Sequence, residues 1–213
     1  FDQFKKSITE ISKLVNPKSL IIIETTVPPG TCKNIVAPII RNEFRNRGII
    51  SSDILLAHSY ERVMPGENYL NSIRNYWRVY SGINKKSEKK CHNFLKKFIN
   101  SKKYPLYKLP NTNSSECAKI IENSYRALNI AFIDEWNNFS LGMDIDLNEV
   151  INSIKIRPSH SNLMSPGLGV GGYCLTKDPL FGYISSKNFL KIKKNNFPLS
   201  TKAIEINNSM PLS

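Results

Sequence analysis

The residues with the clearest chemical potential lie in one glycine-rich segment between Ser165 and Pro179. Its sequence is Ser-Pro-Gly-Leu-Gly-Val-Gly-Gly-Tyr-Cys-Leu-Thr-Lys-Asp-Pro. Its clustered glycines let the backbone approach a ligand closely and leave amide groups available to it. The thiol of Cys174 is followed by Lys177 and Asp178, and nearby positive charge favours the nucleophilic thiolate. The alternative is a flexible loop whose cysteine packs as a small hydrophobic residue.

A second pair of polar residues interrupts a long apolar helical pattern. Lys119 and Asn123 are four residues apart, so both project from one helical face. A charged and a neutral donor side by side could hold an oxyanion or a water molecule. The alternative is an ordinary solvated helix face.

Two further polar groups follow expected strands. Thr25, Thr26 and Val27 belong to Glu-Thr-Thr-Val-Pro-Pro-Gly, at the end of an apolar run. Ligands of open α/β sheets bind at that edge, although threonine also serves in caps and turns. Glu61 and Arg62, in Ser-Tyr-Glu-Arg-Val-Met-Pro-Gly, place a carboxylate beside a guanidinium. The alternative for this pair is a surface ion pair, which stabilises little.

The elements that must position these residues alternate between strand and helix over the first half. Strands are expected at residues 19–26, 54–58, 77–83 and 104–109, and helices at 2–15, 31–46 and 88–100. The uninterrupted run Leu20 to Ile23 is typical of a parallel strand buried on both faces. Pro38 predicts a kink in the second helix. This alternation predicts the second half of a Rossmann-like parallel sheet.

Near residue 111 the pattern becomes helical. Asn113 with Glu116 fits a capping box that opens one long helix, which ends near Gly142. Asp146 with Glu149 fits a second capping box. We therefore expect an α/β domain over residues 1–110 and an all-helical domain over residues 111–213, which includes a proline- and glycine-rich loop at 158–178.

Composition narrows the classes of protein. The chain has 213 residues, 40% hydrophobic and 22% charged, with a net charge of +13, which suits packed domains rather than disorder. No stretch approaches the roughly 20 apolar residues of a membrane helix, so no membrane association is expected. The lysine doublets lack interleaved aromatic residues, so no nucleic-acid partner is expected. Charge-driven nucleic-acid binding, with a steep salt dependence, stays an alternative.

The four cysteines are widely separated along the chain. They are Cys32, Cys91, Cys117 and Cys174. None has the spacing of a metal knuckle or a redox pair, so we expect no metal site and reduced thiols in a cytoplasmic protein. The chain begins at Phe1 with neither an initiator methionine nor a signal peptide, which predicts a fragment.

Four segments, in this order, resemble the UDP-glucose/GDP-mannose dehydrogenase family. They are Thr-Val-Pro-Pro-Gly, Glu-Arg-Val-Met-Pro-Gly, Lys-x-x-x-Asn-Ser-Tyr-Arg-Ala and Pro-Gly-x-Gly-Val-Gly-Gly-x-Cys-x-x-Lys-Asp-Pro. The resemblance covers roughly residues 19–211 and is closer to the branch that oxidises UDP-N-acetylhexosamines, such as UDP-N-acetyl-mannosamine or UDP-N-acetylglucosamine. It implies NAD-dependent oxidation of a UDP-sugar C6 alcohol to a carboxylate, with two NAD+ per turnover, by a homodimer formed through the helical domain.

The resemblance also implies roles for individual residues. Cys174 matches the nucleophile, Asp178 its acid/base partner, and Lys119 with Asn123 the pair that stabilises oxygen charge and positions water. Glu61 matches the carboxylate of thioester hydrolysis, and Thr26 a hydroxyl near cofactor and water. The implied cofactor contacts are Thr25, Thr26, Val27 and Lys177. The implied substrate contacts are Glu61, Arg62, Lys119, Asn123, Ser165, Gly167, Gly169 and Gly171.

The chain departs from the family pattern in three places. The Gly-x-Gly-x-x-Gly loop that binds the NAD pyrophosphate has no counterpart in it, and it stops where the family's connecting helix begins. Tyr60 stands where the family more often has proline. We expect the 213-residue chain to be inactive alone. The alternatives are an inactive dimerisation module, which would bind neither NAD nor UDP-sugar, and a UDP-glucose 6-dehydrogenase.

Overall fold

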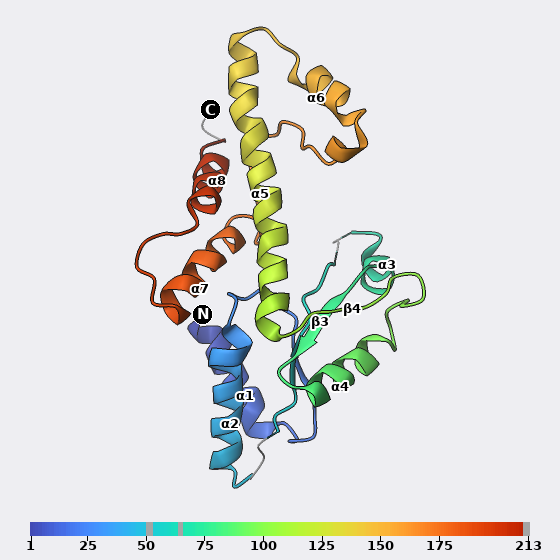
Figure 1. Cartoon of the computed structure of the whole chain (residues 1–213), viewed down its shortest axis with the longest axis vertical. Coiled ribbons are helices and arrows are strands. Elements are labelled where there is room, and N and C mark those ends of the chain that lie inside the picture. Colours follow the sequence, from blue (N-terminus) through green and yellow to red (C-terminus); the bar gives the residue numbers. More distant parts are fainter. Residues whose placement is uncertain (50–52, 64–65, 211–213) are drawn as a thin grey trace. The chain divides into compact units, whose positions relative to one another are not determined.

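The computed structural model describes residues 1–49, 53–63 and 66–210 (Figure 1). The chain divides into two compact units, Phe1–Lys119 and Ile120–Ser213. The long helix α5 (Thr112–Gly142) contributes residues to both. An α/β part followed by an all-helical part confirms the fold class expected from the sequence.

The first unit contains a four-stranded sheet in the order β1-β2-β3-β4. The strands are β1 (Ile21–Ile23), β2 (Leu56–His58), β3 (Val79–Gly82) and β4 (Tyr107–Lys108). β1 pairs with β2 and β3 with β4 in parallel, as expected. β2 and β3 are antiparallel, with Ala57 opposite Gly82, and this pairing was not predicted. The segment between β2 and β3 contains α3 (Tyr69–Arg74), a helix of about 9 Å that the sequence analysis missed. A parallel pair needs a long crossover connection, whereas an antiparallel pair such as β2 and β3 does not.

Helices cover both faces of the sheet (Figure 1). They are α1 (Asp2–Leu14), α2 (Ala37–Asn46) and α4 (Lys85–Leu95). Because side chains alternate along a strand, Ile23 packs with residues of α1 and α2, while Ile22 packs with the cluster that contains Cys91 and Leu95 of α4. Each face of this strand therefore packs against a core cluster, although only Ile23 is fully buried and Ile21 and Ile22 are half-buried.

The helix predicted over residues 31–46 is divided into two helix types close to Pro38, the residue at which a kink was predicted. A π-helix, Cys32–Val36, leads directly into α2, and Pro38 lies in the first turn of α2. Proline has no amide hydrogen, so it is tolerated where helical hydrogen bonding changes register.

The regular secondary structure in the described part of the second unit, up to residue 210, is all helical, and loops connect its helices. Besides its share of α5 it contains α6 (Leu147–Lys155), α7 (Phe181–Phe189), α8 (Pro198–Ser209) and 3₁₀ turns at Pro158–His160 and Asp178–Leu180. Ile133 of α5 packs with Leu147 and Ile151 of α6. The predicted cap of α6 is confirmed, because Asp146 Oδ1 accepts hydrogen bonds from the amides of Asn148 and Glu149.

The predicted capping box at the start of α5 is wrong. Asn111 caps the helix instead, with Oδ1 accepting from the Ser114 amide at 3.0 Å. Glu116 does not reach back to its own helix end. Its carboxylate accepts the amides of Gly30 and Cys32 instead. Two hydrogen bonds to a buried carboxylate stabilise it more than the single, solvent-exposed hydrogen bond of a capping box would.

Within the described residues, the helices are too short or too polar to cross a lipid bilayer.

Candidate active site

The predicted site residues divide between the two units. In the second unit Asp178 is completely buried and lies between two donors. Asn123 Nδ2 donates to one of its oxygens at 2.7 Å, and Lys177 Nζ to the other at 2.6 Å. Asn123 is itself 2% exposed, whereas the Lys177 side chain is about half exposed. The structure thus joins three residues that the sequence analysis placed in two separate motifs.

Cys174 lies one turn before Asp178. Its carbonyl accepts the amides of Lys177 at 3.3 Å and Asp178 at 2.9 Å, so these three residues share one tight turn. The Cys174 thiol is free and exposed, which leaves its sulfur accessible to a bound substrate. The alternative of a cysteine packed as a hydrophobic residue therefore does not apply to Cys174.

The glycine-rich segment before Cys174 lies on the surface. Ser165, Gly167, Gly169 and Gly171 are all exposed. Gly169 has a φ of 125°, a conformation that other residues reach only with strain, so this turn requires glycine. An added Cβ would meet nothing within 4 Å at Gly167 or Gly171, so both positions are open to a ligand.

In the first unit Lys119, Glu61 and Arg62 gather around Tyr60. The Lys119 ammonium is 3.4 Å from the Glu61 carbonyl oxygen and 5.4 Å from the centre of the Tyr60 ring. Arg62 donates to the Tyr60 hydroxyl at 3.0 Å and also lies over the ring, at 5.2 Å. The Glu61 carboxylate accepts the Val63 amide at 2.5 Å.

Tyr60 is the residue in this group that the sequence analysis undervalued. It is 1% exposed, and its ring lies against both cations. A cation over an aromatic face is stabilised by the ring's quadrupole. Tyrosine at this position, where the family more often has proline, therefore gives the Lys119 ammonium an aromatic ring to pack against.

The predicted cofactor loop follows β1. Thr25 is exposed, Thr26 is half-buried and Val27 is buried. Arg78, 5% exposed, donates to the Glu24 carboxylate at the start of this loop. An exposed hydroxyl at the carboxyl end of a parallel strand suits a ligand of an open α/β sheet.

A buried polar network beneath this edge was not foreseen from the sequence. His58 Nδ1 lies 2.8 Å from Ser115 Oγ, which is 2.6 Å from Ser81 Oγ, and all three side chains are fully buried. Burial lowers the pKa of His58 from 6.5 to about 4, so the imidazole is neutral at neutral pH. The network ties the first turns of α5 to β2 and β3.

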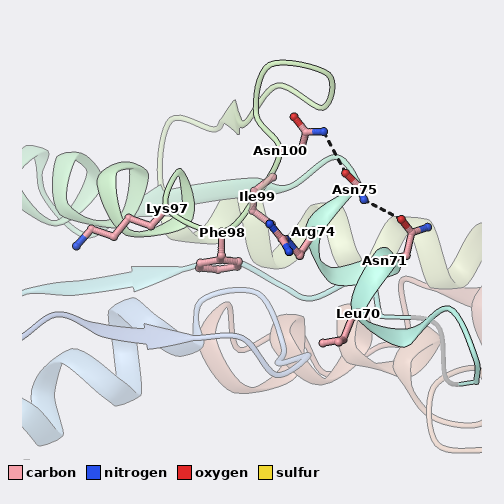
Figure 2. Close-up of a pocket in the computed structure, with 8 residues that line it drawn as sticks. All are labelled: Leu70, Asn71, Arg74, Asn75, Lys97, Phe98, Ile99 and Asn100. Carbon is pink, nitrogen blue, oxygen red and sulfur yellow. Dashed lines mark hydrogen bonds between the residues drawn. The ribbon is translucent and has the colours of Figure 1, made fainter.

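A surface hollow of about 460 Å³ lies elsewhere in the first unit (Figure 2). Its rim carries an amide chain in which Asn100 donates to Asn75 at 3.1 Å and Asn75 to Asn71 at 2.7 Å. None of the predicted site residues lines it. The hollow is therefore separate from the candidate catalytic residues.

Metal-ligating side chains do not cluster in the described ranges 1–49, 53–63 and 66–210: no group of three or more His, Cys, Asp or Glu could hold an ion there.

Comparison with protein families gives two consecutive matches. Residues 1–99 match the model of the UDP-glucose/GDP-mannose dehydrogenase family, NAD binding domain. Residues 113–209 match the model of the central domain of the same family. NAD is accordingly the cofactor of the family domain to which the first matched segment corresponds.

Individual relatives point the same way. The chain is 34% identical over 205 residues to a UDP-N-acetyl-D-mannosamine dehydrogenase of Methanococcus aeolicus, covering 96% of the chain and 42% of the relative. It is 30% identical to one from Campylobacter jejuni, covering 99% and 49%. The solved structure of UDP-D-ManNAc dehydrogenase from Pyrococcus horikoshii is similar, with a TM-score of 0.82 and 27% identity, over 99% of this chain and 46% of that one.

The chain thus spans about half the length of the curated relatives that it matches. The two domain models follow each other in the order of the α/β and helical parts, and the predicted nucleophile and its buried carboxylate lie in the second match. On these grounds the chain belongs to the UDP-glucose/GDP-mannose dehydrogenase family of nucleotide-sugar dehydrogenases.

Proposed function

We propose that the natural protein oxidises the C6 alcohol of a UDP-N-acetylhexosamine to a carboxylate, with UDP-N-acetyl-mannosamine or UDP-N-acetylglucosamine as substrate. The observation that carries this proposal is the buried Asp178, held by Asn123 and Lys177 one turn after the exposed thiol of Cys174. The names of the similar proteins support an N-acetylated sugar. Residues 1–110 would then form the C-terminal half of a Rossmann-like NAD-binding domain, and residues 111–213 the helical central domain.

In this scheme Cys174 acts as a covalent nucleophile. The alcohol first loses a hydride and its hydroxyl proton to give the aldehyde, and the thiolate then adds to the aldehyde carbon while a proton returns to the oxygen, which gives a thiohemiacetal. Loss of a second hydride gives a thioester, and water cleaves it to the acid and the free thiol. Two NAD+ molecules, bound one after the other, would each accept one hydride, so four electrons would leave the sugar. Asp178 takes and returns protons beside the thiol.

The other residues would hold and orient the reactants. Lys119 and Asn123 would donate to the oxygen on which charge develops. Glu61 would activate the water that cleaves the thioester, and Arg62 would contact the sugar nucleotide. The glycine segment with Ser165, Gly167, Gly169 and Gly171 would wrap the substrate. Thr25, Thr26, Val27 and Lys177 would contact NAD.

The stoichiometry of NADH tests this function. Natural polypeptide, isolated from its source at its own length, is expected to form two NADH per molecule of acid, because each of two oxidations releases one hydride. NADH is followed by its absorbance and the acid by mass spectrometry. UDP-N-acetyl-mannosamine, UDP-N-acetylglucosamine and UDP-glucose are compared as substrates. One NADH with an aldehyde as final product would contradict the scheme, and turnover of UDP-glucose alone would favour the alternative substrate.

We also propose that the second unit forms a homodimer through α5. Five large apolar side chains on this helix are each 46–63% exposed: Ile121, Tyr125, Phe132, Trp136 and Phe139. Their spacing of three, four or seven residues places them along one helical stripe. The Trp136 ring lies 6.4 Å from that of Phe132 and 5.7 Å from that of Phe139. An exposed aromatic stripe of this kind marks an interaction surface.

Sedimentation equilibrium tests the dimer. The chain is expected to sediment as a dimer. Trp136→Glu should raise the dissociation constant at least about thirtyfold, because an aromatic anchor that becomes buried in an interface contributes about 2 kcal/mol or more. Asn138→Glu, which is exposed two residues further along the same helix, is the matched control and should leave the dimer intact. A monomeric parent chain would contradict this proposal. A dimer whose natural polypeptide binds neither NAD nor UDP-sugar would support the inactive dimerisation module.

A further inference from the structure

Glu116, in the second turn of α5, carries a carboxylate that is completely buried. Its Oε2 accepts the Gly30 amide at 2.6 Å, and its Oε1 accepts the Cys32 amide at 2.8 Å. Carboxylates are rarely buried this fully unless they are paired. Two charge-assisted hydrogen bonds offset the cost of removing the charge from water. The contact therefore uses both oxygens of a side chain that the sequence analysis had assigned to a helix cap.

The two amides belong to the turn that ends the Thr25–Gly30 loop. Gly30 has a φ of 96°, which only glycine adopts without strain, so the chain is built to turn its amide in this direction. Cys32 opens the π-helix, whose first amides carry partial positive charge. Burial raises the pKa of Glu116, and hydrogen bonds from the Cys32 thiol and from the Cys32, Gly30 and Thr31 amides act in the opposite direction.

The same stretch of α5 touches the ends of other strands. Ser115 contacts His58 of β2 and Ser81 of β3. Lys119, three residues after Glu116, donates to the carbonyl of Glu61 beyond β2. Glu116 completes this set by binding the segment beyond β1, which lies 84 and 86 residues earlier in the chain.

We propose that Glu116 is a positioning residue for the dehydrogenase reaction. Its carboxylate holds the loop with Thr26 and Val27 at a fixed distance from the α5 turn that carries Lys119. The distance between the Thr26 hydroxyl, near the cofactor, and the Lys119 ammonium, the oxyanion donor, is thereby fixed. A misplacement of about 1 Å between reacting groups reduces the rate of a reaction strongly. The catalytic purpose rests on the function proposed above, whereas the holding contact can be tested independently of it.

Three cysteines allow the loop to be tested: Cys32 reports on the loop, Cys91 on the rest of the first unit and Cys174 on the activity of the reagent. Cys32 and Cys91 are both fully buried but belong to different core clusters, and Cys174 is exposed. Alkylation is followed at each cysteine by peptide mass spectrometry in the parent and in Glu116→Gln. The matched control is Glu135→Gln, an exposed glutamate on the same helix. Cys174 labels quickly in every variant and reports that the reagent is active.

In Glu116→Gln, Cys32 is expected to label roughly ten- to hundredfold faster than in the parent, because one carboxylate hydrogen bond is lost and local opening becomes easier. Cys91 should keep its parental rate, and Glu135→Gln should change neither. An unchanged Cys32 rate would overturn the proposal. Equal acceleration of Cys32 and Cys91 would also overturn it, since Glu116 would then support the whole unit and not the loop.

Kinetics of the natural polypeptide test the catalytic purpose. Glu116→Gln is expected to lower kcat at least about tenfold and leave the KM for the sugar nucleotide within about twofold, because misplacement acts on the reacting groups and not on substrate grip. A raised KM with an unchanged kcat would overturn the positioning role. If the parent itself makes no acid, the proposed function fails, and the labelling of Cys32 still decides whether Glu116 holds the loop.

Discussion

Replacing Cys174 with serine is expected to abolish acid formation by the natural polypeptide, with a loss of at least about a thousandfold. A serine hydroxyl is not ionised at neutral pH, so it adds poorly to the aldehyde, and no thioester can form. Asp178 and Asn123 keep their contact in this variant, because only a side-chain sulfur is exchanged at an exposed position. The NADH yield should fall from two per sugar to at most one.

The matched control for this variant is Cys117→Ser. Cys117 is a half-buried free thiol on α5, so its replacement removes a sulfur without touching the Cys174 turn. It should leave the rate of acid formation within about twofold of the parent. Both variants are assayed for acid by mass spectrometry. Acid production by Cys174→Ser at the parental rate would exclude the covalent role of Cys174.

Acidification is expected to destabilise the chain through His58. Folding lowers the pKa of this histidine from 6.5 to about 4, with burial as the main cause. Its contribution is therefore fully present above pH 6.5 and is lost as the pH falls towards 4, since the unfolded chain binds the extra proton. The full effect is about 3 kcal/mol, and about 2 kcal/mol of it should appear between about pH 7 and about pH 4.5.

Urea unfolding followed by circular dichroism at these two pH values measures the effect. His58→Asn keeps a polar group near Ser115 but cannot titrate, so its free energy of unfolding should lose about 2 kcal/mol less than the parent's on acidification. Glu116 has a raised pKa and acts with the opposite sign, so the comparison between variants, and not the parent alone, isolates His58. His160→Asn, in an exposed turn, is the control. Equal acid sensitivity of parent and His58→Asn would contradict the prediction.

The sequence alone determined the features that depend on near neighbours. The cap at Asp146 and the strand at the apolar run of β1 were correctly predicted, and Lys119 and Asn123 lie on one helix as expected. Helical periodicity, end caps and strand alternation arise from residues a few positions apart, so they can be predicted without a tertiary structure. The order of four local motifs was likewise sufficient to indicate the family.

The tertiary structure decided which polar groups meet across the chain. Asp178 binds Asn123, 55 residues earlier, and Glu116 binds Gly30, 86 residues earlier. Only burial distinguishes these carboxylates from solvated ones, and burial depends on distant segments. For this reason the sequence favoured a capping box for Glu116, where desolvation and two amides instead hold it against the loop.

The same reason explains the sheet. The local pattern predicted the strands but assumed parallel pairing throughout, and it missed the short helix α3 between β2 and β3. Strand direction depends on how the connecting chain returns to the sheet, and a six-residue helix gives little periodic signal. What the sequence determined about this protein is therefore its local chemistry and its family. What the tertiary structure decided is which of those groups are desolvated and brought into contact, because the free energy that buries them comes from packing between residues far apart in the sequence.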